Sequence, residues 1–90
     1  MGGWSKQDPT NEEYTNLWYN QVQGLFLTSL NDDKTTQINA RPMIIGVKTQ
    51  VVAGLNILYT IKFDNKIYDI KVFRNLNGDV SITSINNPQV

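Results

Sequence analysis

Residues 55–63 read Leu-Asn-Ile-Leu-Tyr-Thr-Ile-Lys-Phe, and this stretch decides the fold. Apolar side chains occupy every second position from Leu55 to Phe63, and Leu58 is the one residue that breaks the alternation. A period of two is typical of a strand with one face on a core and the other in water. We therefore predict a β-strand here, with its apolar face buried.

The residues after this strand predict two more strands. A short polar turn at 64–66 is followed by residues 68–72, which alternate again. Asn77-Gly78 is the strongest hairpin signal in the chain, and residues 80–85 follow it as a last strand. Short turns join antiparallel neighbours, so these strands are predicted to lie side by side.

The residues before it predict a fourth strand. Residues 43–52 are rich in β-branched side chains apart from Gly46. Together with the later strands, they make residues 38–86 a predicted four-strand meander.

A helix is predicted over residues 10–31, after a flexible trunk over residues 1–9. Thr10 and Glu13 have the spacing of a capping box, and Pro9 disfavours a helix before it. An apolar stripe runs along this segment in steps of four, with Leu17 and Leu25 beside it: Tyr14, Trp18, Val22, Phe26 and Leu30. Gly24 interrupts the helix, and close packing against the sheet would explain it.

One apolar helix stripe needs one apolar sheet face to cover it. We therefore predict a single α+β domain over residues 1–90, with one long α-helix packed across a curved antiparallel meander β-sheet.

Composition excludes most enzyme classes. The 90 residues contain no histidine and no cysteine, so a cysteine nucleophile, a Ser-His-Asp triad and the usual zinc ligands are missing. The eight carboxylates are scattered, and no pair has a reason to be buried together. We expect no catalytic residue, no metal site and no cofactor.

Charge and hydropathy also limit the partners. Eight basic and eight acidic residues give a formal charge of zero, which provides no field toward nucleic acid or anionic lipid. A local excess of base at Lys62, Lys66, Lys71 and Arg74 is interpreted as the polar faces of strands, because no aromatic platform accompanies it. No apolar run is long enough to span a membrane. We expect neither a nucleic-acid nor a membrane partner.

One hairpin tip departs from the usual turn chemistry. Gln50-Val51-Val52-Ala53-Gly54 lies between two predicted strands but has no Asn, Asp or Pro. Two adjacent valines at a tip cannot both face the core, so at least one should be exposed, where a partner could bind it. The pattern alone leaves open a continuous buried strand through these residues.

These five residues match the signature loop of the cystatins letter for letter, and the chain resembles that family over nearly its whole length. Lys48-Thr49 before the loop and Asn56 after it look like the stefins in particular, as do Val72-Phe73 and Leu76. Gly2-Gly3 resembles the N-terminal glycine of the family.

The resemblance implies an inhibitor of papain-like, cathepsin-type cysteine proteases. In the family, an N-terminal trunk, the signature loop and a second hairpin loop form a wedge that fills the protease cleft. Carried over, the trunk is Gly2-Gly3, the first loop is Gln50 to Gly54 with Val51, Val52 and Ala53 at its tip, and the second loop lies around Leu76-Asn77. Trp4 either fills the cleft or packs on the protein's own surface.

The chain departs from the family in its second loop. It has neither the Pro-Trp and disulfides of the secreted branch nor the Leu-Pro of many stefins, and Leu76-Asn77 stands there instead. A cystatin-fold binding module with weak or no inhibition is therefore the alternative function. The resemblance also implies a monomer able to form a domain-swapped dimer, and a cytoplasmic location; the alternative location is that of a secreted mature chain to which Met1 was added.

Overall fold

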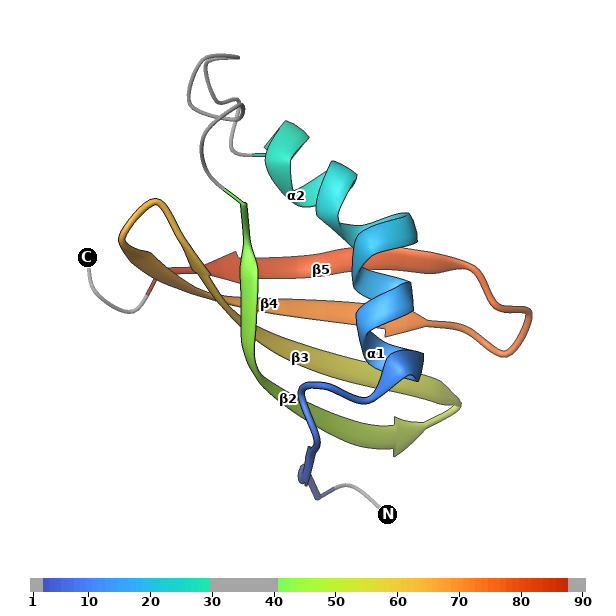
Figure 1. Cartoon of the computed structure of the whole chain (residues 1–90). Coiled ribbons are helices and arrows are strands. Elements are labelled where there is room, and N and C mark those ends of the chain that lie inside the picture. Colours follow the sequence, from blue (N-terminus) through green and yellow to red (C-terminus); the bar gives the residue numbers. More distant parts are fainter. Residues whose placement is uncertain (1–2, 30–40, 88–90) are drawn as a thin grey trace.

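The computed structural model describes residues 3–29 and 41–87, and within them one helix lies across an antiparallel sheet (Figure 1). The strands follow one another in the order β1-β2-β3-β4-β5, so the sheet is a meander. The elements are β1 (Ser5–Gln7), α1 (Glu12–Leu17), a π-helical turn η1 (Trp18–Val22), α2 (Gln23–Ser29), β2 (Met43–Val52), β3 (Gly54–Phe63), β4 (Lys66–Arg74) and β5 (Val80–Asn86).

The predicted α+β arrangement is confirmed, but the sheet has five strands rather than four. The additional strand is β1, in the segment where the sequence predicted a flexible trunk. Ser5 lies opposite Thr49 and Gln7 opposite Val47, and the Gln7 side-chain amide donates a 2.9 Å hydrogen bond to the Thr49 hydroxyl. These contacts fix residues 5–7 along the edge of β2.

The core lies between the helix and the face of the sheet that we call the inner face. The alternation at 55–63 is as predicted, because Ile57, Tyr59, Ile61 and Phe63 are all buried there. Aromatic rings from the helix pack on them at centroid distances of 5.1 Å for Trp18–Tyr59 and 5.8 Å for Phe26–Phe63. Tilted and edge-on ring pairs of this kind add stability beyond the burial of their area.

The π-helical turn keeps the apolar stripe on the core. In an α-helix each residue turns by about 100°, so a step of four overshoots one turn by about 40° and a long stripe drifts away from the sheet. At η1 the backbone N–H of Gln23 instead bonds the Trp18 carbonyl, five residues back, which underwinds the helix. As a result Trp18, Val22 and Phe26 are all fully buried.

Three details of the helix differ from the predictions. The helix begins at Glu12, and its N-cap is Asn11, whose side chain accepts from the Glu13 N–H at 2.9 Å. The predicted cap, Thr10, instead donates its hydroxyl to Asp8, so the capping box was wrong. Leu25 is 46% exposed, and Leu30 and the predicted end at residue 31 lie outside the described residues.

The structure does not support the predicted explanation of Gly24. It lies on an exposed part of α2, and a Cβ added to it would meet no atom within 4 Å. Close packing against the sheet therefore does not account for this glycine, and nothing in the structure requires it.

Candidate functional site

The Gln50–Gly54 segment forms the very tight connection between β2 and β3. Ala53 alone separates the two strands, and Val52 and Val51 lie opposite Gly54 and Leu55. The connection excludes the alternative of one continuous buried strand. Val51 is 66% exposed and Val52 38% exposed, so both valines, together with exposed Ala53, form an apolar tip.

Side chains on both strands hold the base of this tip. The Asn56 amide donates a 3.0 Å hydrogen bond to the Gln50 side-chain oxygen across the β2–β3 pair. Thr49, the residue before Gln50, is buried, and its hydroxyl accepts the Gln7 hydrogen bond that joins β2 to β1. The tip is therefore carried by hydrogen-bonded strands on both sides of β2.

Gly54 is required at its position for two independent reasons. Its φ of +118° lies where side chains are rarely tolerated. A Cβ there would also stand 2.5 Å from the Arg74 carbonyl oxygen and 3.0 Å from the Phe73 ring. The backbone of β4 thus fits against the start of β3 only because Gly54 has no side chain.

The second predicted loop, between β4 and β5, is organised by a residue that sequence reasoning missed. The Asn75 side-chain oxygen accepts from the backbone N–H groups of Asn77 and Asp79, both at 2.9 Å, and its amide donates to the Asp79 carboxylate at 3.3 Å. Such Asn turns mimic backbone hydrogen bonds and hold a loop in one shape. The loop is therefore ordered without a proline, and it displays Leu76 at 83% exposure.

The N-terminal candidates are only partly described. Gly2 lies outside the described residues, while Gly3 is exposed with open space around its Cα. The Lys71 ammonium stands 5.9 Å from the centroid of the Trp4 ring, so Trp4 packs on the outer face of the sheet, the face turned away from the helix. Trp4 remains 40% exposed. The Lys71–Trp4 contact also gives one of the predicted basic residues an aromatic neighbour, which the sequence analysis did not expect.

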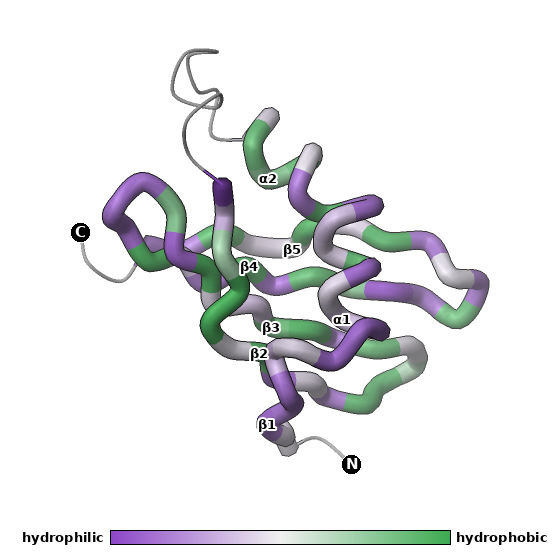
Figure 2. Tube along the Cα trace, viewed as in Figure 1, coloured by the Kyte–Doolittle hydropathy of each residue, from purple (hydrophilic) through white to green (hydrophobic). Residues whose placement is uncertain are grey.

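The meander brings these three segments to one end of the sheet, which we call the loop end. The β2–β3 tip and the β4–β5 loop lie there, whereas the β3–β4 turn lies at the opposite end (Figure 1). Because β1 is antiparallel to β2, the residues just before Ser5 also start from the loop end. Figure 2 shows hydrophobic residues in both loops at this end and a hydrophilic turn at the other.

A shallow hollow separates the two loops. It has a volume of about 360 Å³ and is lined by Gly54, Leu55, Arg74, Asn75 and Leu76. An ion pair stands beside it, because the Arg74 guanidinium lies 3.4 Å from the Glu13 carboxylate at the start of the helix. This pair is partly exposed, so it contributes at most about 1 kcal/mol. It joins the helix start to β4 directly behind the second loop.

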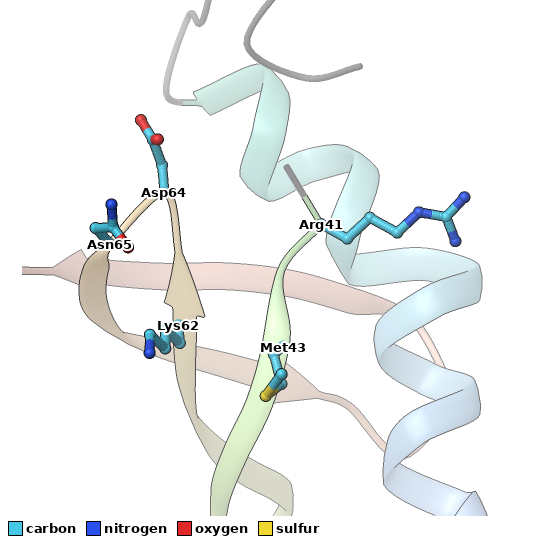
Figure 3. A pocket seen from close by; sticks show the side chains of 5 residues that line it. All are labelled: Arg41, Met43, Lys62, Asp64 and Asn65. Atoms are coloured by element: carbon cyan, nitrogen blue, oxygen red, sulfur yellow. The ribbon is translucent and has the colours of Figure 1, made fainter. Parts of the chain in front are cut away.

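Among the described residues, the opposite end of the sheet offers no comparable site. A hollow of about 300 Å³ lies there between the start of β2 and the β3–β4 turn. Figure 3 shows that its polar side chains diverge, since the Arg41 guanidinium extends away from Lys62 and the Asp64 carboxylate points away from both. A ligand pocket requires polar groups that converge, so this hollow does not qualify.

Within residues 3–29 and 41–87, no three metal-ligating side chains come together as a potential metal site. In that same part of the chain, no helix has the length and apolar character needed to cross a membrane.

One helix packed on a five-stranded antiparallel meander, with two loops at one end, is the cystatin-like α+β arrangement. The chain is similar to mialostatin of Ixodes ricinus, with 35% identity over 69 residues. That match takes in 70% of this chain and 39% of mialostatin, so the chain spans well under half the length of this relative. No family model matches the chain.

Proposed function

We propose that this protein is a tight, reversible and competitive inhibitor of papain-like cysteine proteases of the cathepsin type. The observation that carries the proposal is the apolar tip, where Val51 and Val52 are 66% and 38% exposed on a tight turn. Apolar side chains held out in water on a rigid connection are unfavourable until a partner covers them. A protease cleft is a concave partner of the kind that such a narrow tip fits.

The proposed mechanism is obstruction of the cleft without chemistry. The tip enters the cleft between the trunk at Gly2-Gly3 on one side and Leu76-Asn77 on the other, and substrate is excluded. The Asn56–Gln50 and Asn75 hydrogen bonds order both loops before binding, so little conformational entropy is lost in the complex. An interface of about 800 Å² per partner can be very tight when its parts are ordered in advance.

The likeness to mialostatin supports an inhibitor of the cystatin type. Lys48-Thr49 before the loop and Asn56 after it lead us to propose the stefin-like kind. We assign the protease-binding role to the tip (Gln50 to Gly54), to Gly2, Gly3 and Trp4 at the trunk, and to Leu76 and Asn77. In this assignment Trp4 braces the trunk against the sheet, because Lys71 lies over its ring.

The test is a titration of papain, followed by cleavage of a fluorogenic peptide. Val51→Glu places a charge on the exposed tip, and we expect inhibition at least about 100-fold weaker, which corresponds to roughly 2.7 kcal/mol. Leu25→Glu is the matched control, because it places the same charge on a 46% exposed leucine of the helix. That control should inhibit like the parent protein.

Unfolding curves of all three proteins show whether each variant remains folded. Equal inhibition by Val51→Glu and the parent would exclude the tip as the binding element. A folded parent protein that inhibits neither papain nor a cathepsin would favour the alternative, a binding module that keeps the fold without the activity.

A further inference from the structure

The outer face of the sheet carries two lysines directly opposite each other. Lys6 on β1 pairs with Lys48 on β2, and both side chains are exposed. Residues opposite each other in an antiparallel pair have Cβ atoms about 5 Å apart, and like charges in such a pair are destabilising. The ion pair found among the described residues joins Arg74 to Glu13 and does not relieve this repulsion. The pair therefore has a cost in stability that an anion would remove.

More positive charge continues across the same face. In the register, Lys48 lies opposite Leu58 and Leu58 opposite Lys71, which places Lys71 two strands, or about 10 Å, beyond Lys48. Lys62 is exposed on the same face of β3, and the acidic residue there is Asp69, which already accepts a 3.0 Å hydrogen bond from Thr60. The chain as a whole has a formal charge of zero, so the positive charge on this face is a local excess.

A hollow lies beside the Lys6–Lys48 pair. It has a volume of about 240 Å³, and its lining includes Lys6, Lys48, Gly46, Thr60, Pro9 and Ile45. Two features of β2 create it. The strand has a bulge between Ile44 and Gly46, and a Cβ added to Gly46 would project to 3.5 Å from the Thr60 Cβ. Bulges often occur where a strand forms a binding site.

We propose that the outer face binds a sulfated polysaccharide, with one sulfated sugar unit in the hollow beside Lys6 and Lys48. Ammonium groups attract sulfates as point charges, and the Thr60 hydroxyl, which donates to Asp69, can accept a hydrogen bond from a sugar hydroxyl. Further sulfates along the same chain reach Lys71 and Lys62. This site lies on a different surface from the loop end and does not depend on the proposed inhibition.

The chemistry of the face favours this polyanion over two others. Single-stranded nucleic acid is bound through aromatic rings on which bases stack, but the Trp4 ring already has Lys71 beside it. A membrane-binding face inserts several large apolar side chains next to its basic ones, whereas this hollow has one exposed apolar side chain, Ile45, with Gly46 and Thr60 beside it.

The test is the affinity of the full chain for heparin, measured by calorimetry at low salt and by the salt needed for elution from a heparin column. We expect Lys6→Gln/Lys48→Gln to bind at least tenfold more weakly. The matched control, Arg41→Gln/Lys66→Gln, removes the same charge from exposed positions elsewhere and should change affinity less than twofold. Papain inhibition by both double variants should equal that of the parent.

A second variant tests the hollow rather than the charge. Gly46→Ala adds one methyl group at an ordinary contact distance from Thr60, so the fold should tolerate it. We expect it to weaken heparin binding about threefold or more while every lysine remains. Heparin should also raise the unfolding temperature of the parent but not that of Lys6→Gln/Lys48→Gln.

Four outcomes would overturn the proposal. The first is that the parent does not bind heparin, and the second is that the two double variants lose equal affinity for it. The third is that Gly46→Ala binds heparin with full affinity. The fourth is that the parent binds desulfated heparin, single-stranded DNA or phosphatidylserine vesicles as tightly as heparin.

Discussion

The two hairpins that share β3 both reverse the chain in a tight turn, but their turns are stabilised in different ways. The β3–β4 turn consists of Asp64 and Asn65 with φ of 53° and 62°, polar residues that adopt this conformation readily. The β2–β3 turn is apolar, and its one positive φ is at Gly54, which is pressed against β4. The first turn is stable through its own residues, whereas the second depends on the rest of the sheet. Such a turn, held in place by the rest of the sheet, leaves its apolar side chains exposed for the partner that we propose.

The largest expected effect is at Gly54. Gly54→Ala combines an unfavourable φ with a Cβ only 2.5 Å from the Arg74 carbonyl oxygen, and we expect a loss of about 3 kcal/mol or more in the free energy of unfolding. Gly78→Ala is the control, because Gly78 has a φ of +91° but nothing within 4 Å. It should lose only about 1–2 kcal/mol. Urea unfolding measures both, and equal losses would show that the contact with β4 is unimportant.

The next effect concerns how the loop end is ordered. Asn75→Ala removes the hydrogen bonds to Asn77 and Asp79, so the second loop must be ordered during binding. We expect papain inhibition about tenfold weaker, or about 1.4 kcal/mol. Leu76→Ala tests the side chain that this loop displays. If Asn75→Ala inhibits like the parent while Leu76→Ala is weaker, the leucine matters and the order of the loop does not.

A smaller effect is expected at Tyr59, in the strand that both hairpins share. Its hydroxyl donates to the Tyr14 carbonyl at 2.7 Å, and Tyr59→Phe should lower stability by about 1 kcal/mol at neutral pH. Burial raises the pKa of Tyr59 above its ordinary value of 10.0, and burial raises the pKa of Tyr14 too.

The sign of the pH dependence follows from these raised pKa values. The folded protein keeps both tyrosines protonated at a pH where the unfolded chain loses protons. The contribution of the two tyrosines to the free energy of unfolding is therefore complete below pH 10.0 and is lost as the pH rises above it. Urea unfolding between pH 7 and 11 should show this fall, and Tyr59→Phe should make it shallower. An unchanged slope would mean that Tyr59 does not control the alkaline transition.

The smallest effect is expected at the polar turn. Asn65→Gly fits the φ of 62° without a side-chain penalty and should raise stability by about 0.5 kcal/mol. Papain inhibition should not change, because this turn lies at the end of the sheet opposite the two loops (Figure 1). A change in inhibition would contradict the proposal that protease binding is confined to the loop end.

Periodicity predicted the strands and the helix because their buried side chains recur at regular intervals along one face. The strands of each hairpin are also close in sequence. The exposed valines were predictable because the tip breaks the turn rules. The strand β1 was not, since Ser5–Gln7 has no apolar alternation and pairs with a strand far along the chain. The π-helical turn had a signal that the predictions did not use, namely apolar steps of four rather than a mixture of three and four.

Of two contributors to the candidate sites that the predictions missed, one could have been suggested from the sequence and the other could not. Asn75 is a favourable turn residue near Asn77-Gly78, so its role could have been suggested by turn chemistry. The Lys6–Lys48 pair could not, because it depends on the register of β1 against β2. Gly54 was identified from the resemblance, but its contact with the Arg74 carbonyl is a matter of packing alone.

The attachment of β1 has a consequence for how the chain folds. The other strand pairs are hairpins between sequence neighbours, whereas Gln7 and Thr49 are 42 positions apart. Closing so long a loop costs about 2–3 kcal/mol more than closing a tight turn, and three residues of pairing return little of it. We expect β1 to join the sheet last and to detach first, with fast amide exchange at Lys6. The strand β1 then has an opening equilibrium of its own, separate from the unfolding of the other four strands.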